Sequence, residues 1–94
     1  MRTLKRWTEY GIRTIDEFGD VIDVDYRDRK AAAFAAARKL LVGDGVYAVV
    51  VERERKSAYV DDYGNVEDLQ VEYETVAAVG DEAACDRWKD GGGA

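Results

Sequence analysis

The chain has 94 residues, 47% hydrophobic and 36% charged, and its net charge at pH 7 is −6. It contains no histidine and one cysteine. This composition excludes Ser-His-Asp and Cys-His catalysis, most zinc sites and an intramolecular disulfide. No apolar run approaches the roughly 20 residues of a membrane span, and Met1 to Arg6 lacks the apolar stretch of a signal peptide. We therefore expect one cytoplasmic domain with no membrane association.

The first predicted element is a β-hairpin. Residues 6–16 alternate with a period of two, and Gly19 in the following turn can adopt positive φ. Residues 21–26 alternate again. Their apolar members share one face: Ile22, Val24 and Tyr26. Since Asp23 and Asp25 occupy the other face, the pattern is typical of a hairpin with one buried and one solvated side.

A helix is predicted next. Asp28 is placed as its N-cap, and the run RKAAAFAAARKLLV ends at Gly43. One stripe of the helix should lie on the sheet: Ala33, Phe34, Ala37, Leu40 and Leu41. The opposite side is rich in alanine. Either alanine serves there as the best helix former, or its small side chain lets another helix approach closely.

A second, longer hairpin is predicted after the helix. Val46 to Lys56 begins with both faces apolar, which favours a central position or cover by a second layer. Its second half alternates charges, so we expect it to project beyond the sheet or lie at an edge. Residues 61–65 form a turn. The returning strand is expected to place these residues on one face: Leu69, Val71, Tyr73, Thr75 and Ala77.

A short C-terminal helix completes the pattern. Asp81 is its predicted cap, and Ala84, Cys85 and Trp88 share one side. The order ββαββ(α) predicts an α+β fold with two layers, a four-stranded, mainly antiparallel sheet and one helix across it. A β-grasp-like strand order and another antiparallel order both stay open. We expect a single domain over residues 1–90 and a flexible Gly-rich tail over 91–94.

The residues predict no catalytic, cofactor or metal site. Acids surround the second turn, but their spacing does not match a calcium-binding loop, so we interpret them as solvated charges. The Gly43-Asp44-Gly45 segment precedes a strand rather than a helix, which makes it a poor phosphate loop. Cys85 is interpreted as a small buried apolar residue, with a reactive thiol as the alternative. We expect a protein that is not an enzyme.

One stretch of the chain has the style of a known class. It comprises the strand from Trp7 to Arg13, the turn Phe18-Gly19-Asp20-Val21 and the Ala-Ala-Phe-Ala helix that opens at Asp28. This arrangement resembles the small accessory proteins of phages that infect GC-rich, actinobacterial-type hosts. The resemblance implies a viral protein located in the host cytoplasm, with a host or phage protein as its partner.

The leading hypothesis is therefore a protein that is not an enzyme and that binds another protein. In one version of this hypothesis it inhibits that partner. Its partner-binding residues are predicted to be exposed aromatics and nearby acids: Trp7, Tyr59, Tyr63, Trp88, Asp61, Asp62, Glu72 and Glu74. One alternative is an acidic mimic of nucleic acid that blocks a DNA- or RNA-binding defence or host complex. Another is a small homo-oligomeric structural protein, with a homodimer as the simplest form. The acidic balance argues against direct nucleic-acid binding.

Overall fold

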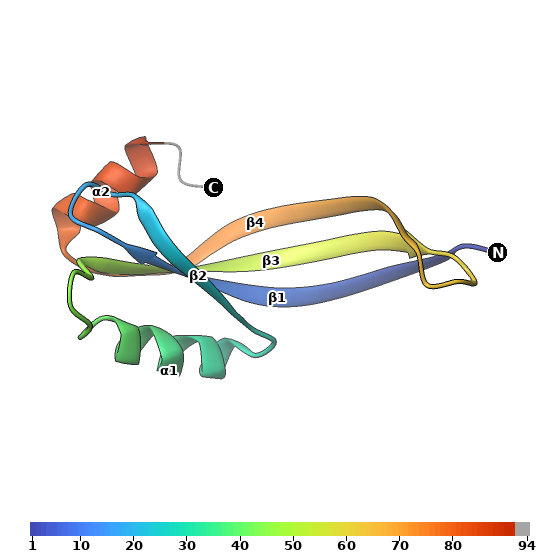
Figure 1. Cartoon of the computed structure of the whole chain (residues 1–94), viewed down its shortest axis with the longest axis horizontal. Coiled ribbons are helices and arrows are strands. Elements are labelled where there is room, and N and C mark those ends of the chain that lie inside the picture. The colour runs from blue at the N-terminus through green and yellow to red at the C-terminus, as the bar shows by residue number, and fades with distance from the viewer. Residues whose placement is uncertain (92–94) are drawn as a thin grey trace.

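The computed structural model describes residues 1–91 and contains one sheet and two helices (Figure 1). The elements are β1 (Thr3–Ile15), β2 (Val21–Arg27), α1 (Lys30–Leu40), β3 (Ala48–Val60), β4 (Val66–Gly80) and α2 (Glu82–Asp90). This ββαββα order confirms the predicted α+β fold. Except for Gly91, the predicted tail lies outside the described residues.

The sheet has the strand order β2-β1-β3-β4, and every neighbouring pair is antiparallel. Of the two arrangements that the sequence left open, the structure therefore has the simple antiparallel sheet. β2 has only seven residues and pairs with β1 from Tyr10 to Ile15, whereas β1, β3 and β4 have 13 to 15 residues each. The three long strands run on past β2, and the molecule measures 49 × 26 × 18 Å.

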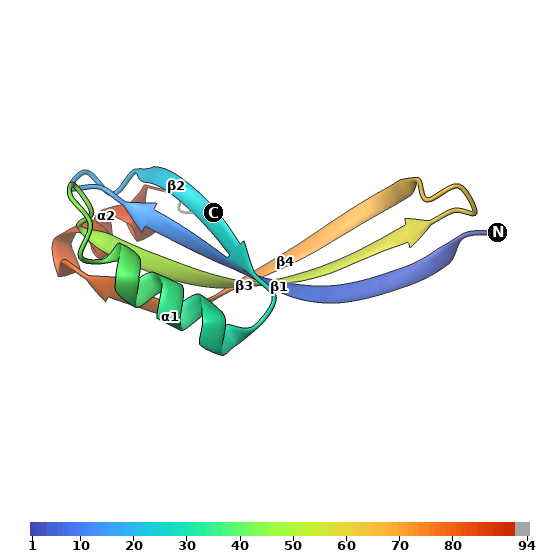
Figure 2. The ribbon, with the colours of Figure 1, turned by 60° about the horizontal axis from the view of Figure 1, so that its bottom comes forward.

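These lengths divide the molecule into two regions, which Figure 2 shows on either side of a narrow waist. The body contains both helices, β2, and the adjoining parts of the other strands (10–15, 48–51 and 76–80). The arm is a three-stranded ribbon without a helix, formed by residues 3–9, 52–60 and 66–75 with the turn 61–65.

The helices lie on opposite faces of the body, so the sheet there is the middle of three layers (Figure 1). On the α1 face, Ile12, Val49 and Val51 pack with Ala33 and Ala37 of the helix. On the α2 face, the buried cluster is Ile15, Ala48, Val50, Ala84, Cys85 and Trp88. The predicted two-layer arrangement thus gains a third layer, which explains why both faces of the first half of β3 are apolar.

The ends of the helices are only partly as predicted. Asp81 is the N-cap of α2, and its carboxylate accepts a hydrogen bond from the backbone N–H of Ala84 at 3.0 Å. In α1 the N-cap is Arg29, and no side chain caps the helix. The prediction of Asp28 as the cap is therefore wrong by one position. The predicted inner stripe of α1 is confirmed, since Ala33 and Ala37 are buried and Phe34 packs against the same cluster.

The predicted buried face of β2 is wrong. Val24 is 39% exposed, Tyr26 is 45% exposed and Ile22 is 52% exposed. Val24 and Tyr26 point to the α2 face, because they lie opposite Arg13 and Gly11 of β1. α2 packs against β1, β3 and β4, so it does not reach this edge of the sheet. The alternation correctly places Val24 and Tyr26 on the same face of β2, but the short helix α2 does not cover that face.

A β-bulge in β4 changes the predicted faces of that strand. The register with β3 shifts between the pairs Val51–Ala77 and Glu52–Thr75, which leaves Val76 as the extra residue. Thr75 therefore faces the α2 side, as Glu52 does, while Ala77 faces α1 together with Val51. The prediction that Thr75 and Ala77 share one face is wrong for this reason.

Candidate functional site

All of the predicted partner-binding residues except Trp88 lie on the arm. Trp7 is on β1, Tyr59 is on β3, and Glu72 and Glu74 are on β4. The turn at the tip carries the others: Asp61, Asp62 and Tyr63. Segments far apart in the chain thus bring these residues into one region of the molecule.

Trp88 does not belong to this surface. It is 4% exposed and packs under α2 against the sheet, in the cluster that contains Ile15 and Val50. The nine-residue helix α2 depends on this contact, because a helix of that length needs tertiary packing. The prediction of Trp88 as an exposed anchor is therefore wrong, and its role is to hold α2 on the body.

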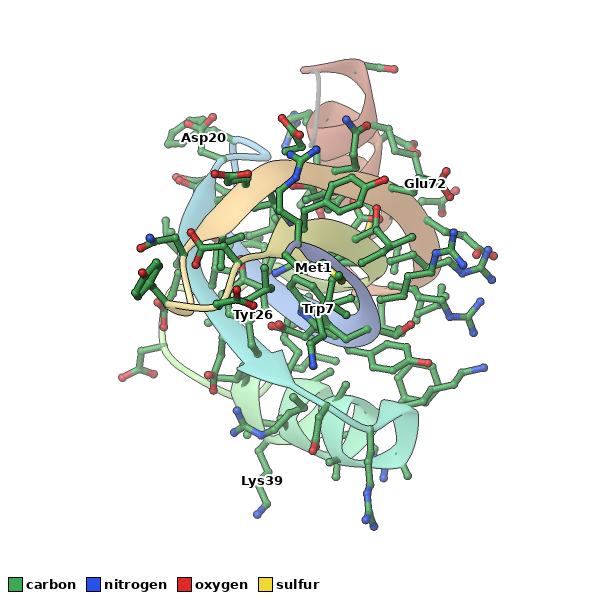
Figure 3. All side chains as sticks on the ribbon, turned by 90° about the vertical axis from the view of Figure 1, so that its right-hand side faces the viewer. Met1, Trp7, Asp20, Tyr26, Lys39 and Glu72 are labelled. Carbon is green, nitrogen blue, oxygen red and sulfur yellow. The ribbon has the colours of Figure 1, made fainter. Side chains whose placement is uncertain are left out.

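The arm aromatics occupy different sides of the ribbon. Trp7 lies opposite Lys56 and faces the α2 side, while Tyr59 lies opposite Leu4 and faces the α1 side. Each is 37% exposed, and Tyr63 at the tip is 91% exposed. Figure 3 looks along the molecule from the tip and shows Trp7 and Glu72 pointing in different directions. The aromatics thus surround the arm rather than form one patch.

Polar contacts hold two of these aromatic rings in place. The indole N–H of Trp7 donates a hydrogen bond to the Glu9 carboxylate at 2.9 Å. The guanidinium of Arg2 lies over the Tyr59 ring, 4.7 Å from its centre. Each ring thus has one polar neighbour that favours a particular orientation.

The two acids of the tip turn have separate roles. The Asp61 carboxylate accepts hydrogen bonds from the backbone N–H groups of Tyr63 and Asn65, both at 2.9 Å. The bonds from Asn65 in particular hold the pKa of Asp61 below its usual value. Asp61 thus builds the turn that presents Tyr63. Asp62 lies 2.7 Å from the Met1 amino nitrogen.

Arginines lie beside several acids of β4. Glu74 is 3.1 Å from Arg53 and 3.9 Å from Arg55 of the neighbouring strand. At the tip, Arg2 is 3.1 Å from Glu67, and the hydrogen bond to that carboxylate raises the pKa of Arg2. The α1 side of the arm therefore carries alternating charges rather than a uniform row of acids.

The same side of the arm contains a hollow of about 420 Å³. Its lining crosses all three strands: Arg6, Trp7, Thr8, Arg55, Lys56, Ser57, Gln70, Val71 and Glu72. Arg6 and Arg55 lie on adjacent strands, one opposite Ser57 and the other opposite Thr8. The hollow thus combines Glu72 with two guanidinium groups and two hydroxyl-bearing residues.

Two buried carboxylates at the start of the arm were missed by the sequence interpretation. Glu52 and Glu54 are each 2% exposed, although they lie in the segment predicted to project or form an edge. That segment does project, but as the central strand of the arm. The Glu54 carboxylate lies 3.4 Å from Arg13 and 3.6 Å from Lys56, and Glu52 accepts a hydrogen bond from the Thr75 hydroxyl at 2.8 Å.

Neighbouring strands provide the cover for this charged cluster. The ring of Tyr73 lies 5.8 Å from the Arg13 guanidinium, and the ring of Tyr26 lies 5.3 Å from the Lys56 ammonium. Gly11 leaves room for Glu54, since a Cβ at that position would collide with the Glu54 carboxylate. An isolated glycine inside a strand is the signal that could have indicated this close approach.

The structure identifies no metal centre and no activated thiol. Within residues 1–91, no group of three His, Cys, Asp or Glu side chains is placed to hold a metal ion. Cys85 is 7% exposed, and burial raises the pKa of its thiol, which disfavours the reactive thiolate. Neither of the two helices in this range has the length and apolar character to cross a membrane.

No family model, no curated protein and no solved structure matches the chain. A function can therefore be inferred only from the residues and their geometry.

Proposed function

We propose that the protein binds another protein through its arm and has no enzymatic role of its own. The observation that carries the proposal is the location of the predicted residues. Trp7, Tyr59 and Tyr63 remain accessible on a ribbon that neither helix covers. Large exposed aromatics contribute strongly to protein interfaces, since they supply apolar contact at a small entropy cost.

The charge of the arm favours a partner with basic groups. Residues 61–74 contain six acids and no base. Glu72 lies in the hollow without an ion pair to any residue of the described range, whereas Glu74 and Glu67 have arginine neighbours. A lysine or arginine of a partner could therefore approach Glu72, while Arg6 and Arg55 would favour an acid nearby.

The alternatives make different predictions about this surface. A nucleic-acid mimic needs a continuous acidic face, but arginines alternate with the acids on the α1 side of the arm, which favours a protein-specific surface. A homo-oligomeric structural role would place a second copy on the same arm. A phage origin with a host or phage protein as the partner fits the proposal, as does inhibition of that partner.

The test is affinity capture from host lysate followed by mass spectrometry. The wild type is compared with the double variant Tyr59→Ala, Tyr63→Ala. A matched control is Phe18→Ala, Tyr47→Ala, which removes two exposed aromatics, 70% and 44% exposed, that lie outside the arm. We expect the arm variant to lose a partner that the control retains.

Equal recovery of every partner by the three proteins would refute the arm as the binding surface. Repeating the capture at 1 M salt separates the proposal from the mimic. A mimic should lose its partner there because screening removes its attraction, whereas an aromatic interface should retain much of it. Light scattering of the purified protein decides whether a second copy is the partner.

A further inference from the structure

The outer edge of β4 offers backbone groups for pairing. β4 is the last strand of the sheet, and within residues 1–91 it pairs only with β3. Along the body its edge runs from Val76 to Gly80. An exposed strand edge presents a row of unpaired N–H and C=O groups, which can receive an added strand.

A groove lies beside this part of the edge. α1 packs against β1, β2 and β3, and between the helix and β4 there is a hollow of about 310 Å³. Its lining is mainly apolar: Phe34, Ala37, Arg38, Val51, Ala77 and Val79. Since an apolar cavity of ~150 Å³ can hold benzene, the hollow has room for one large apolar side chain.

A basic charge lies at the end of the groove away from the arm. α1 carries Lys30, Arg38 and Lys39 and no acid, and Arg38 lines the hollow without an ion pair to any residue from 1 to 91. α1 and β4 run in the same direction (Figure 1), so Arg38 lies beyond Phe34, at the end away from the arm.

We propose that this groove binds an extended peptide segment of another protein as an added strand on the edge of β4. The segment has an apolar side chain that fills the hollow. A carboxylate beyond it meets Arg38. Main-chain pairing supplies affinity, while the hollow and Arg38 select the sequence.

This peptide site is independent of the proposed arm surface. Its hollow lies between Phe34 of the helix and Val79 of the strand, and no arm aromatic lines it. The double variant Tyr59→Ala, Tyr63→Ala should therefore bind the peptide as the wild type does. A protein that failed the lysate capture could still pass the peptide test, and the reverse also holds.

The test is selection of displayed random octapeptides on the full chain. The wild type should enrich peptides that combine an apolar residue with a nearby acid. Arg38→Glu should enrich a base in place of that acid, and it should bind the wild-type peptides about tenfold more weakly. Lys39→Glu is the matched control. Lys39 lines a different hollow, on the other flank of α1, together with Asp25 and Arg27. Figure 3 shows its side chain pointing away from the sheet.

A synthetic copy of the most enriched wild-type peptide then maps the site by NMR titration of the full chain. Shifts should concentrate at Val76–Gly80 and on α1. Val79→Asp should weaken binding roughly thirtyfold, because it places a charge in the hollow, whereas Val66→Asp on the same strand should not. Enrichment of no peptide, the same peptides for wild type and Arg38→Glu, or shifts confined to the arm would each overturn the proposal.

Discussion

In the body, a helix covers each face of the sheet, and the β3 side chains from Ala48 to Val51 are inaccessible to solvent. In the arm, the same strand continues without a helix on either face, and yet Glu52 and Glu54 are as inaccessible as the valines. The cover there comes from the long side chains of neighbouring strands, whose apolar parts lie across the sheet.

The comparison shows two ways of building a sheet interior. The body uses apolar layers, so its stability should depend on volume and shape. At the start of the arm the interior is the buried Glu54 carboxylate, which lies beside the charges of Arg13 and Lys56. The stability of this region should therefore depend on the pairing of these charges. The outer arm lacks both kinds of interior, which leaves its aromatics free for other contacts.

The two tryptophans give the largest expected contrast. Trp88→Ala removes the side chain that fixes α2, and we expect it to lower the free energy of unfolding by about 3–5 kcal/mol. Trp7→Ala in the arm should cost about 1 kcal/mol or less. Urea denaturation followed by circular dichroism measures both. Equal losses would show that the arm is as much a part of the folded core as the body.

Two glutamates test the charged interior. Glu54→Gln leaves Arg13 and Lys56 without their buried carboxylate, and we expect a loss of about 3 kcal/mol. Glu72→Gln, on the exposed strand of the same arm, should change the free energy of unfolding by less than about 0.5 kcal/mol. The same denaturation experiment applies. If Glu54→Gln were neutral, the cluster would not stabilise the junction between arm and body.

The smallest expected effect concerns the tip turn. The pKa of Asp61 in the folded state lies below its unfolded value of about 3.9, so its carboxylate stabilises the fold above that pH. This contribution disappears as the pH falls through the lower, folded pKa. Asp61→Ala should therefore lower the melting temperature at pH 7, and the difference from wild type should shrink below about pH 4.

Asp62→Ala is the control for the turn, since the carboxylate of Asp62 does not accept the turn's backbone N–H bonds. Its melting temperature should follow that of the wild type throughout the pH range. A constant gap between Asp61→Ala and wild type down to pH 2 would contradict the assignment.

The elements of the fold could be predicted from local patterns, because the alternation of the strands, the Asp81 cap and the inner stripe of α1 are encoded within a few residues. The arm could be anticipated only in part. Alternating charges indicated that residues 52–55 project, but the burial of Glu54 depends on Gly11 and Arg13 of β1 and on Tyr73, its partner on β4. Such contacts between distant segments leave no periodic signal.

The candidate site follows the same rule. The predicted aromatics of the strands and turn are exposed, whereas Trp88 is buried, because a short amphipathic helix does not reveal which surface it packs on. The groove beside β4 was not predicted, since it exists only because α1 stops short of the last strand.

The extra residue in β4 also determines where the arm points. Val76 has no partner in the register of β3, and a bulge of this kind bends its strand and increases the local twist. It stands where β4 passes from the arm (66–75) to the body (76–80). Deleting Val76 would restore a regular ladder in which Thr75 and Ala77 keep their present partners. The same contacts would then hold a less twisted β4 beside the unbroken β1–β3 ladder, so this one residue contributes to the direction in which the arm leaves the body.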